Sequence, residues 1–263
     1  MALSKIPPAG HAQYVGARNL IINGAMQVAQ RGTVTSATVN YGGADRYQFA
    51  RDGAAAVTLS KDTDVPSNQG FSTSQKIDVT TADSSLAAGD YALVRQIIEA
   101  QNLQHLLYGT SEVKKLTLQF WVKSPKTGTH IVELYHLDAN YFNSQSYTIS
   151  AANTWQKVTM TFDGYQTTAI DNNNDGGIQV AWWLAAGSTY SGGTLSSNTW
   201  HNTTANRAVG QVNVMDSTSN NFYITGVQLE VGDIASDFEH RSYGDELARC
   251  QRYYQLSGTQ GNN

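Results

Sequence analysis

The sequence predicts an all-β fold in which two sheets stack as a sandwich. From residue 19 onward, short runs of β-branched and aromatic residues alternate with clusters of Gly, Asn, Asp and Ser, a spacing typical of sandwiches and not of βαβ units. Apolar residues occupy every second position in several runs, for example at Leu116, Leu118 and Phe120. Such alternation buries one face of a strand and leaves the other face polar. In chain order, the expected strands are Asn19–Ile22, Arg46–Arg51, Ala56–Ser60, Ser74–Thr80, Tyr91–Ile98, Lys115–Lys123, Thr129–Leu137, Ser146–Ile149, Gln156–Phe162, Ile178–Ala185, Gln211–Val214 and Phe222–Glu230.

Two helices are expected beside the sheets. The segment Gln101–Tyr108 has leucines at helical spacing and precedes a glycine, which predicts a short helix at an edge of the sandwich. Near the C-terminus, Ser242 lies three positions before Asp245, an arrangement that caps the first turn of a helix. A C-terminal helix is therefore expected from about residue 244 to residue 255. Its apolar stripe, at i, i+3 and i+7, consists of Leu247, Cys250 and Tyr254.

The composition excludes several classes of function. The chain has 263 residues, with 17 Lys and Arg against 21 Asp and Glu, and its net charge of −4 does not suit an electrostatic nucleic-acid binder. Charged residues make up 14% of the chain, against roughly 25% in an average soluble domain, which predicts a neutral surface rich in hydroxyl and amide groups. The longest apolar run, Val180–Ala186, is much shorter than the roughly 18 residues of a membrane span, so we expect no membrane insertion. With one cysteine, the chain has no internal disulfide.

The chain divides into three expected parts. Residues 1–17 contain prolines and glycines and no periodic pattern, so they are expected to form an arm. They also lack the charged and apolar regions of a secretion signal. Residues 18–240 carry the strands of the sandwich, and residues 241–263 carry the C-terminal helix and a tail.

No group of residues in the sequence predicts catalysis. The six histidines are scattered, and the acidic residues follow no spacing that would bring together a nucleophile, a base and an orienting group. A depolymerase would need acidic residues gathered in one groove. We therefore expect a protein without enzymatic activity.

A polar loop before the strand 178–185 resembles a calcium-binding loop. Oxygen-bearing side chains alternate at Asp171, Asn173 and Asp175, and a glycine follows at the sixth position. The twelfth position, however, holds Trp182 in place of the glutamate that completes such a site, and strands flank the loop. The alternative is a polar hairpin turn, because Asn, Asp and Gly tolerate left-handed backbone geometry. A structural calcium is thus one of two interpretations of this loop.

The long segment Gly187–Ala208 interleaves aromatic rings with hydroxyl and amide groups. Two rings, Tyr190 and Trp200, lie in it, and on the preceding strand Trp182 and Trp183 must point to opposite faces of the sheet. Such rings suit a sugar, whose apolar face stacks on a ring while its hydroxyls bind nearby polar groups. The candidate carbohydrate-binding residues are therefore Trp183, Tyr190 and Trp200. The same rings would also cap the core or fill a subunit interface, and the sequence favours this interpretation because no polar triad points at a ligand.

Several blocks of the sequence carry a further signal: MALSKIPPAG, NLIINGAMQVAQRG, LTLQFWVKSPKTGTHIVELY, AANTWQKVTMTF, WWLAAGSTYSGG and ITGVQLEVGDIASDFEHRSYGDELARCQRYY. Together they resemble a family of bacteriophage virion proteins, the tail-fibre or receptor-binding-like subunits, over about residues 19 to 254. The resemblance implies a jelly-roll sandwich related in shape to carbohydrate-binding modules. Such modules often hold a structural calcium near their first and last strands, which would single out Asn23 and Glu230.

The resemblance also implies a function. The chain would be a virion structural protein, a tail-fibre, spike or head-decoration subunit that assembles onto the particle and contributes to host adsorption. Its partners would be other virion proteins, with residues 1–17 as the attachment. The subunit would be a homotrimer, with Leu247, Cys250 and Tyr254 at the threefold axis. The alternative function is a carbohydrate-binding module that recognises host surface glycans through Trp183, Tyr190 and Trp200.

Overall fold

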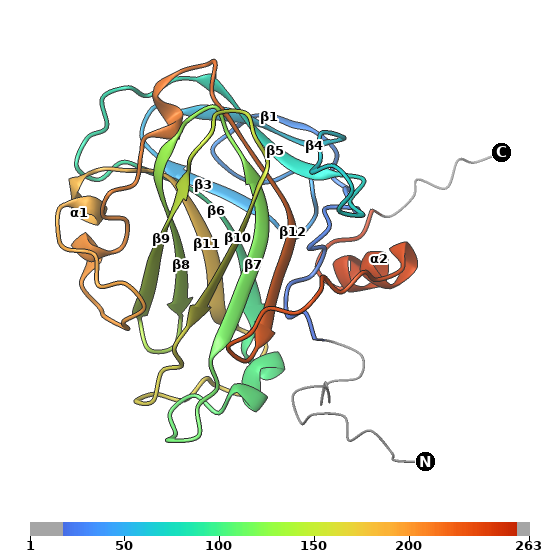
Figure 1. The fold of residues 1–263 in the computed structure, drawn as a ribbon, viewed down its shortest axis with the longest axis vertical. Helices are drawn as coiled ribbons and strands as arrows, with labels where there is room; N and C mark the ends of the chain where they lie inside the picture. The colour runs from blue at the N-terminus through green and yellow to red at the C-terminus, as the bar shows by residue number, and fades with distance from the viewer. Residues whose placement is uncertain (1–17, 257–263) are drawn as a thin grey trace, which may run out of the picture.

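The computed structural model describes residues 18–256, which form two six-stranded antiparallel sheets packed face to face (Figure 1). The first sheet consists, in spatial order, of β1 (Val34–Ala37), β4 (Ala56–Asp62), β5 (Ser74–Thr81), β12 (Asn221–Val231), β7 (Leu116–Lys123) and β10 (Gln156–Phe162). The second consists of β2 (Val39–Tyr41), β3 (Gln48–Asp52), β6 (Tyr91–Glu99), β11 (Gly176–Ala186), β8 (Gly128–His136) and β9 (Tyr141–Ile149). The last strand, β12, lies inside the first sheet between β5 and β7. The expected jelly-roll sandwich is therefore confirmed, while the expected arm, residues 1–17, and the tail from residue 257 lie outside the described residues.

The alternating pattern of the sequence decides which side of each strand is buried. In β7, Leu118 and Phe120 belong to the core between the sheets. Gln119, between them, lies on the outer face, where its amide donates a hydrogen bond to the carbonyl of Ser236 (2.6 Å). The paired strand β10 continues the same pattern, because Val158 lies opposite Phe120 in the register. The period-two rule thus places the core as the sequence predicts.

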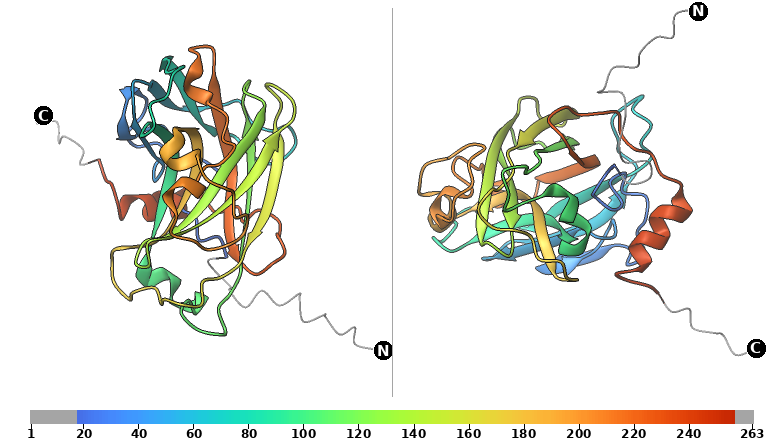
Figure 2. Two further views of the ribbon diagram at one scale, coloured as in Figure 1. Left: turned by 90° about the vertical axis from the view of Figure 1, so that its left-hand side faces the viewer. Right: turned by 90° about the horizontal axis from the view of Figure 1, so that it is seen from below.

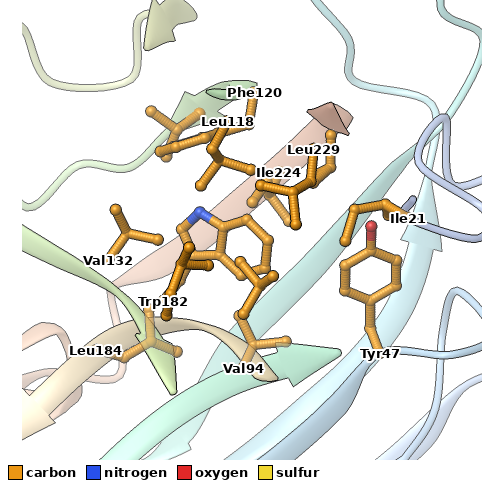
Figure 3. Packing of buried hydrophobic residues seen from close by; sticks show 14 of the residues in the cluster. Ile21, Tyr47, Val94, Leu118, Phe120, Val132, Trp182, Leu184, Ile224 and Leu229 are labelled. Atoms are coloured by element: carbon orange, nitrogen blue, oxygen red, sulfur yellow. The ribbon is translucent and has the colours of Figure 1, made fainter. Parts of the chain in front are cut away.

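Trp182 of β11 lies at the centre of this core (Figure 3). Its ring meets Phe120 of the other sheet edge to face, with ring centroids 5.6 Å apart. Figure 3 shows the indole surrounded by aliphatic side chains from both sheets, including Val94, Val132 and Ile224. Burial of so large an aromatic side chain between the sheets contributes strongly to stability.

Two of the expected strands are not strands. The segment Asn19–Ile22 runs beside β12, where the amide of Leu20 donates to the carbonyl of Leu229 (2.9 Å). The side chain of Asn19 interrupts the ladder, because its amide donates to the carbonyl of Val227 (3.0 Å) and its oxygen accepts from the amide of Leu229 (3.0 Å). The second segment, Gln211–Val214, is irregular and leads into a 3-10 helix, η4 (Val214–Asp216). Conversely, the sequence does not predict β1 and β2, which are short edge strands with mostly exposed or half-buried side chains.

The helices agree with the expectations in position but not always in type. The expected edge helix is a 3-10 helix, η2 (Ala100–Leu106), which ends at Leu107 in a left-handed conformation (φ 56°). The expected C-terminal helix is confirmed as α2 (Tyr243–Gln251), although it ends before the expected residue 255, and the hydroxyl of Ser242 caps it by accepting from the amide of Asp245 (3.2 Å). A short helix not expected from the sequence, α1 (Ser188–Ser191), follows β11. Within residues 18–256, no helix has the length and apolar character needed to cross a bilayer.

The helices α1 and α2 lie at opposite sides of the sandwich (Figures 1 and 2). The loops around α1 cover the outer face of the second sheet, whereas α2 lies beside the first described residues of the chain. The described ends of the chain, at residues 18 and 256, are on the α2 side. The α1 side and the α2 side are therefore two separate regions of the molecule.

Candidate functional site

The outer face of the second sheet carries a second, smaller apolar cluster. Trp183 is its largest member, and Leu93 of β6 and Ile131 of β8 flank it. Trp182, its neighbour in β11, points the other way into the main core, so the two indoles lie on opposite faces as the period-two rule requires. Trp183 is the outward ring of the pair, yet it is only 1% exposed. Another segment of the same chain therefore covers the Trp183 ring.

The cover is the segment 187–210, which contains α1. Tyr190 of α1 packs against Trp183 with ring centroids 5.3 Å apart, and Ala208 is buried in the same cluster. The carbonyl of Tyr190 accepts from the amide of Ala208 (2.9 Å), which closes the segment on itself. We call this segment the cover loop. Its apolar contacts explain why so long a connection is ordered.

A buried ion pair fixes the cover loop to the sheet. The guanidinium of Arg207 donates two hydrogen bonds to the carboxylate of Glu133 in β8, at 2.7 and 2.9 Å. Glu133 is fully buried, and the Arg207 guanidinium also lies 3.9 Å from the ring centroid of Phe142. Burial acts to lower the pKa of Arg207, but the carboxylate of Glu133 outweighs it and raises that pKa, so the guanidinium stays charged. Two-pronged pairs of this kind specify one orientation of the loop.

A groove of about 160 Å³ opens where the cover loop ends. Three tyrosines that line it are half-buried, Tyr91 from β6, Tyr135 from β8 and Tyr190 from the cover loop. Tyr91 and Tyr190 meet edge to face, with ring centroids 5.5 Å apart. The full lining consists of Tyr91, Leu93, Arg95, Tyr135, Gln179, Trp183, Tyr190 and Arg207.

Polar groups in the groove are held in place by neighbouring amides. Arg95 donates from Nε to the side-chain oxygen of Gln48 (2.9 Å) and from Nη1 to that of Gln179 (3.0 Å). Among the described residues, Arg95 forms no ion pair, so its charge is not cancelled by a carboxylate contact. Aromatic rings beside fixed hydrogen-bond donors are the combination that binds a ligand with one apolar face and several hydroxyl groups.

The sequence found part of this groove. Trp183 and Tyr190 were candidate carbohydrate-binding residues, and the structure brings them together, with Tyr190 as the more accessible ring. The sequence missed Tyr91, Arg95 and Tyr135. A signal was present in the strand pattern, because all three occupy outward positions in strands that flank β11. Using it required the order of the strands, which the sequence did not reveal.

The third candidate, Trp200, does not belong to the groove. Its indole nitrogen donates to the carbonyl of Asp163 (2.6 Å), and its ring packs against Tyr108 and Tyr165 at centroid distances of 6.0 and 5.6 Å. The ring is part of the edge of the main core. This placement of Trp200 agrees with the second interpretation from the sequence, in which the ring caps the core.

The polar loop at residues 171–175 is shaped by hydrogen bonds to its neighbours. Its carbonyls are occupied, since Asn173 accepts from the amide of Gln101 (2.9 Å) and Asp171 from the side chain of Gln104 (2.9 Å). The side-chain oxygen of Asn173 accepts from the amide of Asp175 (2.9 Å), as in a turn. Within the described part of the chain, no group of three or more His, Cys, Asp or Glu side chains is placed to hold a metal. The geometry of Asp171, Asn173 and Asp175 therefore agrees with the polar-turn interpretation.

The other calcium candidates are engaged as well. The side-chain oxygen of Asn23 accepts from the amide of Val28 (3.0 Å), and its nitrogen donates to the carbonyl of Asp45 (3.0 Å). The carboxylate of Glu230 accepts from the amide of Ser236 (2.8 Å) and from the side chain of Gln228 (2.9 Å). Both side chains serve the fold around β12.

The apolar stripe of α2 faces its own chain. Cys250 is 1% exposed, and burial raises the pKa of its thiol to about 12. The ring of Tyr254 lies under the guanidinium of Arg31, which is 3.5 Å from the ring centroid. Leu247 is half-buried on α2, whereas Tyr254 lies beyond its last residue, Gln251. This placement does not support Leu247, Cys250 and Tyr254 as a subunit interface, and the trimer remains a prediction.

Comparison with known proteins gives similarity of shape at low sequence identity. No protein-family model matches the chain, and no curated protein sequence matches it. Among solved structures, the enzymatically active domain of tailspike protein 4 from bacteriophage CBA120 is 15% identical with a TM-score of 0.44, covering 81% of this chain and 21% of that chain. A family 11 carbohydrate-binding module from Clostridium thermocellum in complex with a β-1,3-1,4-mixed-linked tetrasaccharide is 11% identical with a TM-score of 0.38, covering 78% and 98%. A sugar-binding protein from Bacteroides thetaiotaomicron, described as putative, is 13% identical with a TM-score of 0.40, covering 81% and 99%.

Proposed function

We propose that this protein is a glycan-recognition subunit that binds a saccharide in the groove beside the cover loop. One observation carries the proposal: accessible tyrosine rings from β6, β8 and the cover loop converge with Arg95 on the outer face of the second sheet. A pyranose presents an apolar face of C–H groups and a rim of hydroxyls. The tyrosine rings can stack on the apolar face, and the guanidinium of Arg95 can donate hydrogen bonds to the hydroxyls.

The groove is largely formed without a ligand. The cover loop is fixed by Arg207, and the guanidinium of Arg95 is oriented by two amide oxygens. A site whose side chains are already in position loses less conformational freedom on binding. The volume of about 160 Å³ suits a single sugar ring lying across a shallow surface, the rest of a longer chain remaining in solvent.

We propose binding without turnover at this site. Glu133 is the carboxylate that a groove residue binds by hydrogen bonds, and it is buried beneath Arg207 and bound by it at two points. A carboxylate held in this way is not free to accept a proton from water or to attack a sugar. Incubation with host polysaccharide should release no reducing ends, and their release above a heat-inactivated control would contradict this part of the proposal.

The binding test compares tyrosines inside and outside the groove. A glycan array would identify a saccharide, and isothermal titration calorimetry would measure its affinity for the wild type and for the Tyr91→Ala and Tyr190→Ala variants. Loss of a stacking ring should weaken binding at least tenfold, a free-energy change of about 1.4 kcal/mol. Tyr243→Ala, on the exposed surface of α2, is the matched control and should bind as the wild type.

Two results would overturn the glycan proposal. One is the absence of any saccharide ligand at millimolar concentration. The other is a saccharide whose affinity is the same for the wild type and for both groove variants. Trp200→Phe, at the edge of the core, should leave binding unchanged, in contrast to the role first expected for Trp200.

A virion is the proposed location of this subunit. The resemblance of the sequence blocks to tail-fibre and receptor-binding-like subunits supports it. The described chain ends also lie on the side away from α1 (Figure 1), and Tyr190 of α1 lines the groove. A subunit attached on the α2 side would present the groove away from the particle. Removing residues 1–17 should leave the sandwich folded and abolish incorporation into particles. Finding the truncated protein on purified particles would refute this mode of attachment.

A further inference from the structure

A second cavity lies on the other side of the molecule, between α2 and the end of the second sheet. Its volume is about 280 Å³. Its walls come from the first described residues, from β6, from η2 and from α2. The lining consists of Asn19, Leu20, Ile22, Arg46, Gln96, Ile98, Asn102, His105, Arg249 and Tyr253.

The cavity has an excess of positive charge, although the chain as a whole is acidic. Two arginines line it, Arg46 and Arg249, and within residues 18–256 neither forms an ion pair. Other arginines around α2 are neutralised. Arg252 binds Glu99 (2.8 Å), and Arg241 binds both Glu239 and Glu246 (2.9 Å each).

Arg46 is held rigidly at the wall of this cavity. Its Nη2 donates to the carbonyl of Ile97 (2.6 Å), and its guanidinium lies 3.3 Å from the ring centroid of Tyr253. Its backbone is in the left-handed region (φ 78°), which a residue with a side chain adopts only where the surroundings enforce it. Its Nε is buried and has no hydrogen-bond acceptor among the described residues. The buried Nε is out of reach of a ligand in the cavity, so an anion there would meet the rest of the guanidinium, a fixed charge that contacts no carboxylate among the described residues.

The rest of the cavity is lined by aliphatic and amide side chains. Leu20, Ile22 and Ile98 supply an apolar wall, and the side chains of Gln96 and Asn102 add amide groups. Inorganic anions have no surface to bury against such a wall. A planar carboxylate matches the fork of an arginine, and the body of an organic acid would cover the aliphatic side chains.

We propose that this cavity binds a small organic carboxylate that has an apolar face, no larger than a single sugar ring. The carboxylate lies between Arg46 and Arg249, and the apolar face lies against the aliphatic wall. Two sources share this chemistry, an acidic sugar and an aromatic or aliphatic acid. The site is distinct from the glycan groove and does not depend on it, because the two are lined by different residues.

The test uses simple acids and their neutral counterparts. Calorimetry with the full chain would compare glucuronate with glucose, and benzoate with benzamide. We expect at least one acid to bind at millimolar concentration or better, and its neutral counterpart to bind at least about tenfold more weakly. The acid that binds identifies the source of the carboxylate, and inorganic phosphate should bind more weakly than that acid.

Variants locate the binding in the cavity. Arg249→Gln, at a half-buried position of α2, should weaken binding of the acid at least about tenfold without unfolding the chain. Arg46→Gln should weaken it further, and circular dichroism would establish that this variant keeps its fold. Lys157→Gln removes a positive charge from the exposed face of β10 and should bind as the wild type.

Several outcomes would overturn the proposal. The proposal would be wrong if neither glucuronate nor benzoate bound at millimolar concentration. It would also be wrong if the Arg249→Gln variant bound the acid with unchanged affinity. Equal affinity for inorganic phosphate and for the organic acid would show that the apolar wall contributes nothing. Loss of acid binding in Tyr91→Ala would place the ligand in the glycan groove instead.

Discussion

The two sheets of the sandwich are each covered on the outside by a segment of the chain, but by different interactions. On the second sheet, the cover loop packs on the apolar cluster around Trp183 and is fixed by the buried pair of Glu133 and Arg207. On the first sheet, residues 232–240 are held by polar side chains of the strands. Gln228, for example, accepts from the amide of Glu239 (2.7 Å).

Within the described residues, the groove beside the cover loop has a volume of about 160 Å³, whereas the pocket beside residues 238 and 239 has only about 10 Å³. An apolar cover must exclude water from its centre, and at its margin it leaves half-buried rings that a ligand can contact. A polar cover is satisfied by the hydrogen bonds it makes, as between Ser236 and Glu230 (2.8 Å). The candidate glycan groove follows from the choice of an apolar cover.

The largest expected effect separates the two tryptophans of β11. Trp182→Ala leaves a cavity between the two sheets, and the hydrogen-bonded strands cannot move together to fill it. The substitution should therefore lower the free energy of unfolding by about 4 kcal/mol. Trp183→Ala should cost only about 2 kcal/mol, because the cover loop can settle into the space. Urea denaturation followed by circular dichroism measures both. Equal losses of unfolding free energy in the two variants would mean that the cover loop cannot move into the space any more than the sheets can.

The next effect concerns the ion pair under the cover loop. Arg207→Met leaves the buried carboxylate of Glu133 without a partner and should lower the free energy of unfolding by about 3 kcal/mol. The double variant Glu133→Leu, Arg207→Met removes both charges and should recover most of the loss. Chemical denaturation of the two variants tests this. A single variant as stable as the wild type would show that the pair does not fix the loop.

A third comparison is between the two faces of β8. Glu133 points outward to its partner, whereas His130 points inward, stacks on Tyr147 and is fully buried. Burial lowers the pKa of His130 to about 4, although the carbonyl of Lys126 acts in the opposite direction. The folded chain therefore excludes a proton that the unfolded chain binds below about pH 6.5.

The sign of the resulting pH dependence follows from that difference. The stability associated with the neutral imidazole is fully present above about pH 6.5 and is lost as the pH falls toward 4. At pH 5 the free energy of unfolding should have fallen by about 2 kcal/mol from this group. Urea titrations at pH 7 and pH 5 should show it. The His130→Phe variant should lose less stability over this interval than the wild type, and an identical loss would assign the effect to other groups.

The smallest expected effect comes from the polar cover. Gln228→Ala removes the acceptor of the Glu239 amide and one donor to Glu230, and it should lower the free energy of unfolding by about 1 kcal/mol. Hydrogen exchange should become faster in residues 232–240 and stay unchanged in the cover loop. A loss as large as that of Arg207→Met would remove the distinction between the two covers.

The sequence predicted the framework better than the site. Alternation located most strands, and the cap at Ser242 located α2, because these signals are carried by neighbouring residues. The strand expected at Asn19–Ile22 was wrong since an asparagine side chain replaces the backbone in the ladder. Of the three candidate sugar-binding rings, Trp200 has an aromatic and polar setting like that of Tyr190, yet it caps the core.

The sequence by itself determined that two sheets enclose one core and that consecutive tryptophans lie on opposite faces of a strand. Only the tertiary structure decided which indole faces outward, and that Arg207 meets Glu133 from 74 positions away. The same holds for Tyr91 and Tyr190, which become neighbours through the order of strands and the path of a loop. Alternation is a local property of the chain, whereas contacts between distant side chains depend on how whole strands are arranged, which no local pattern specifies.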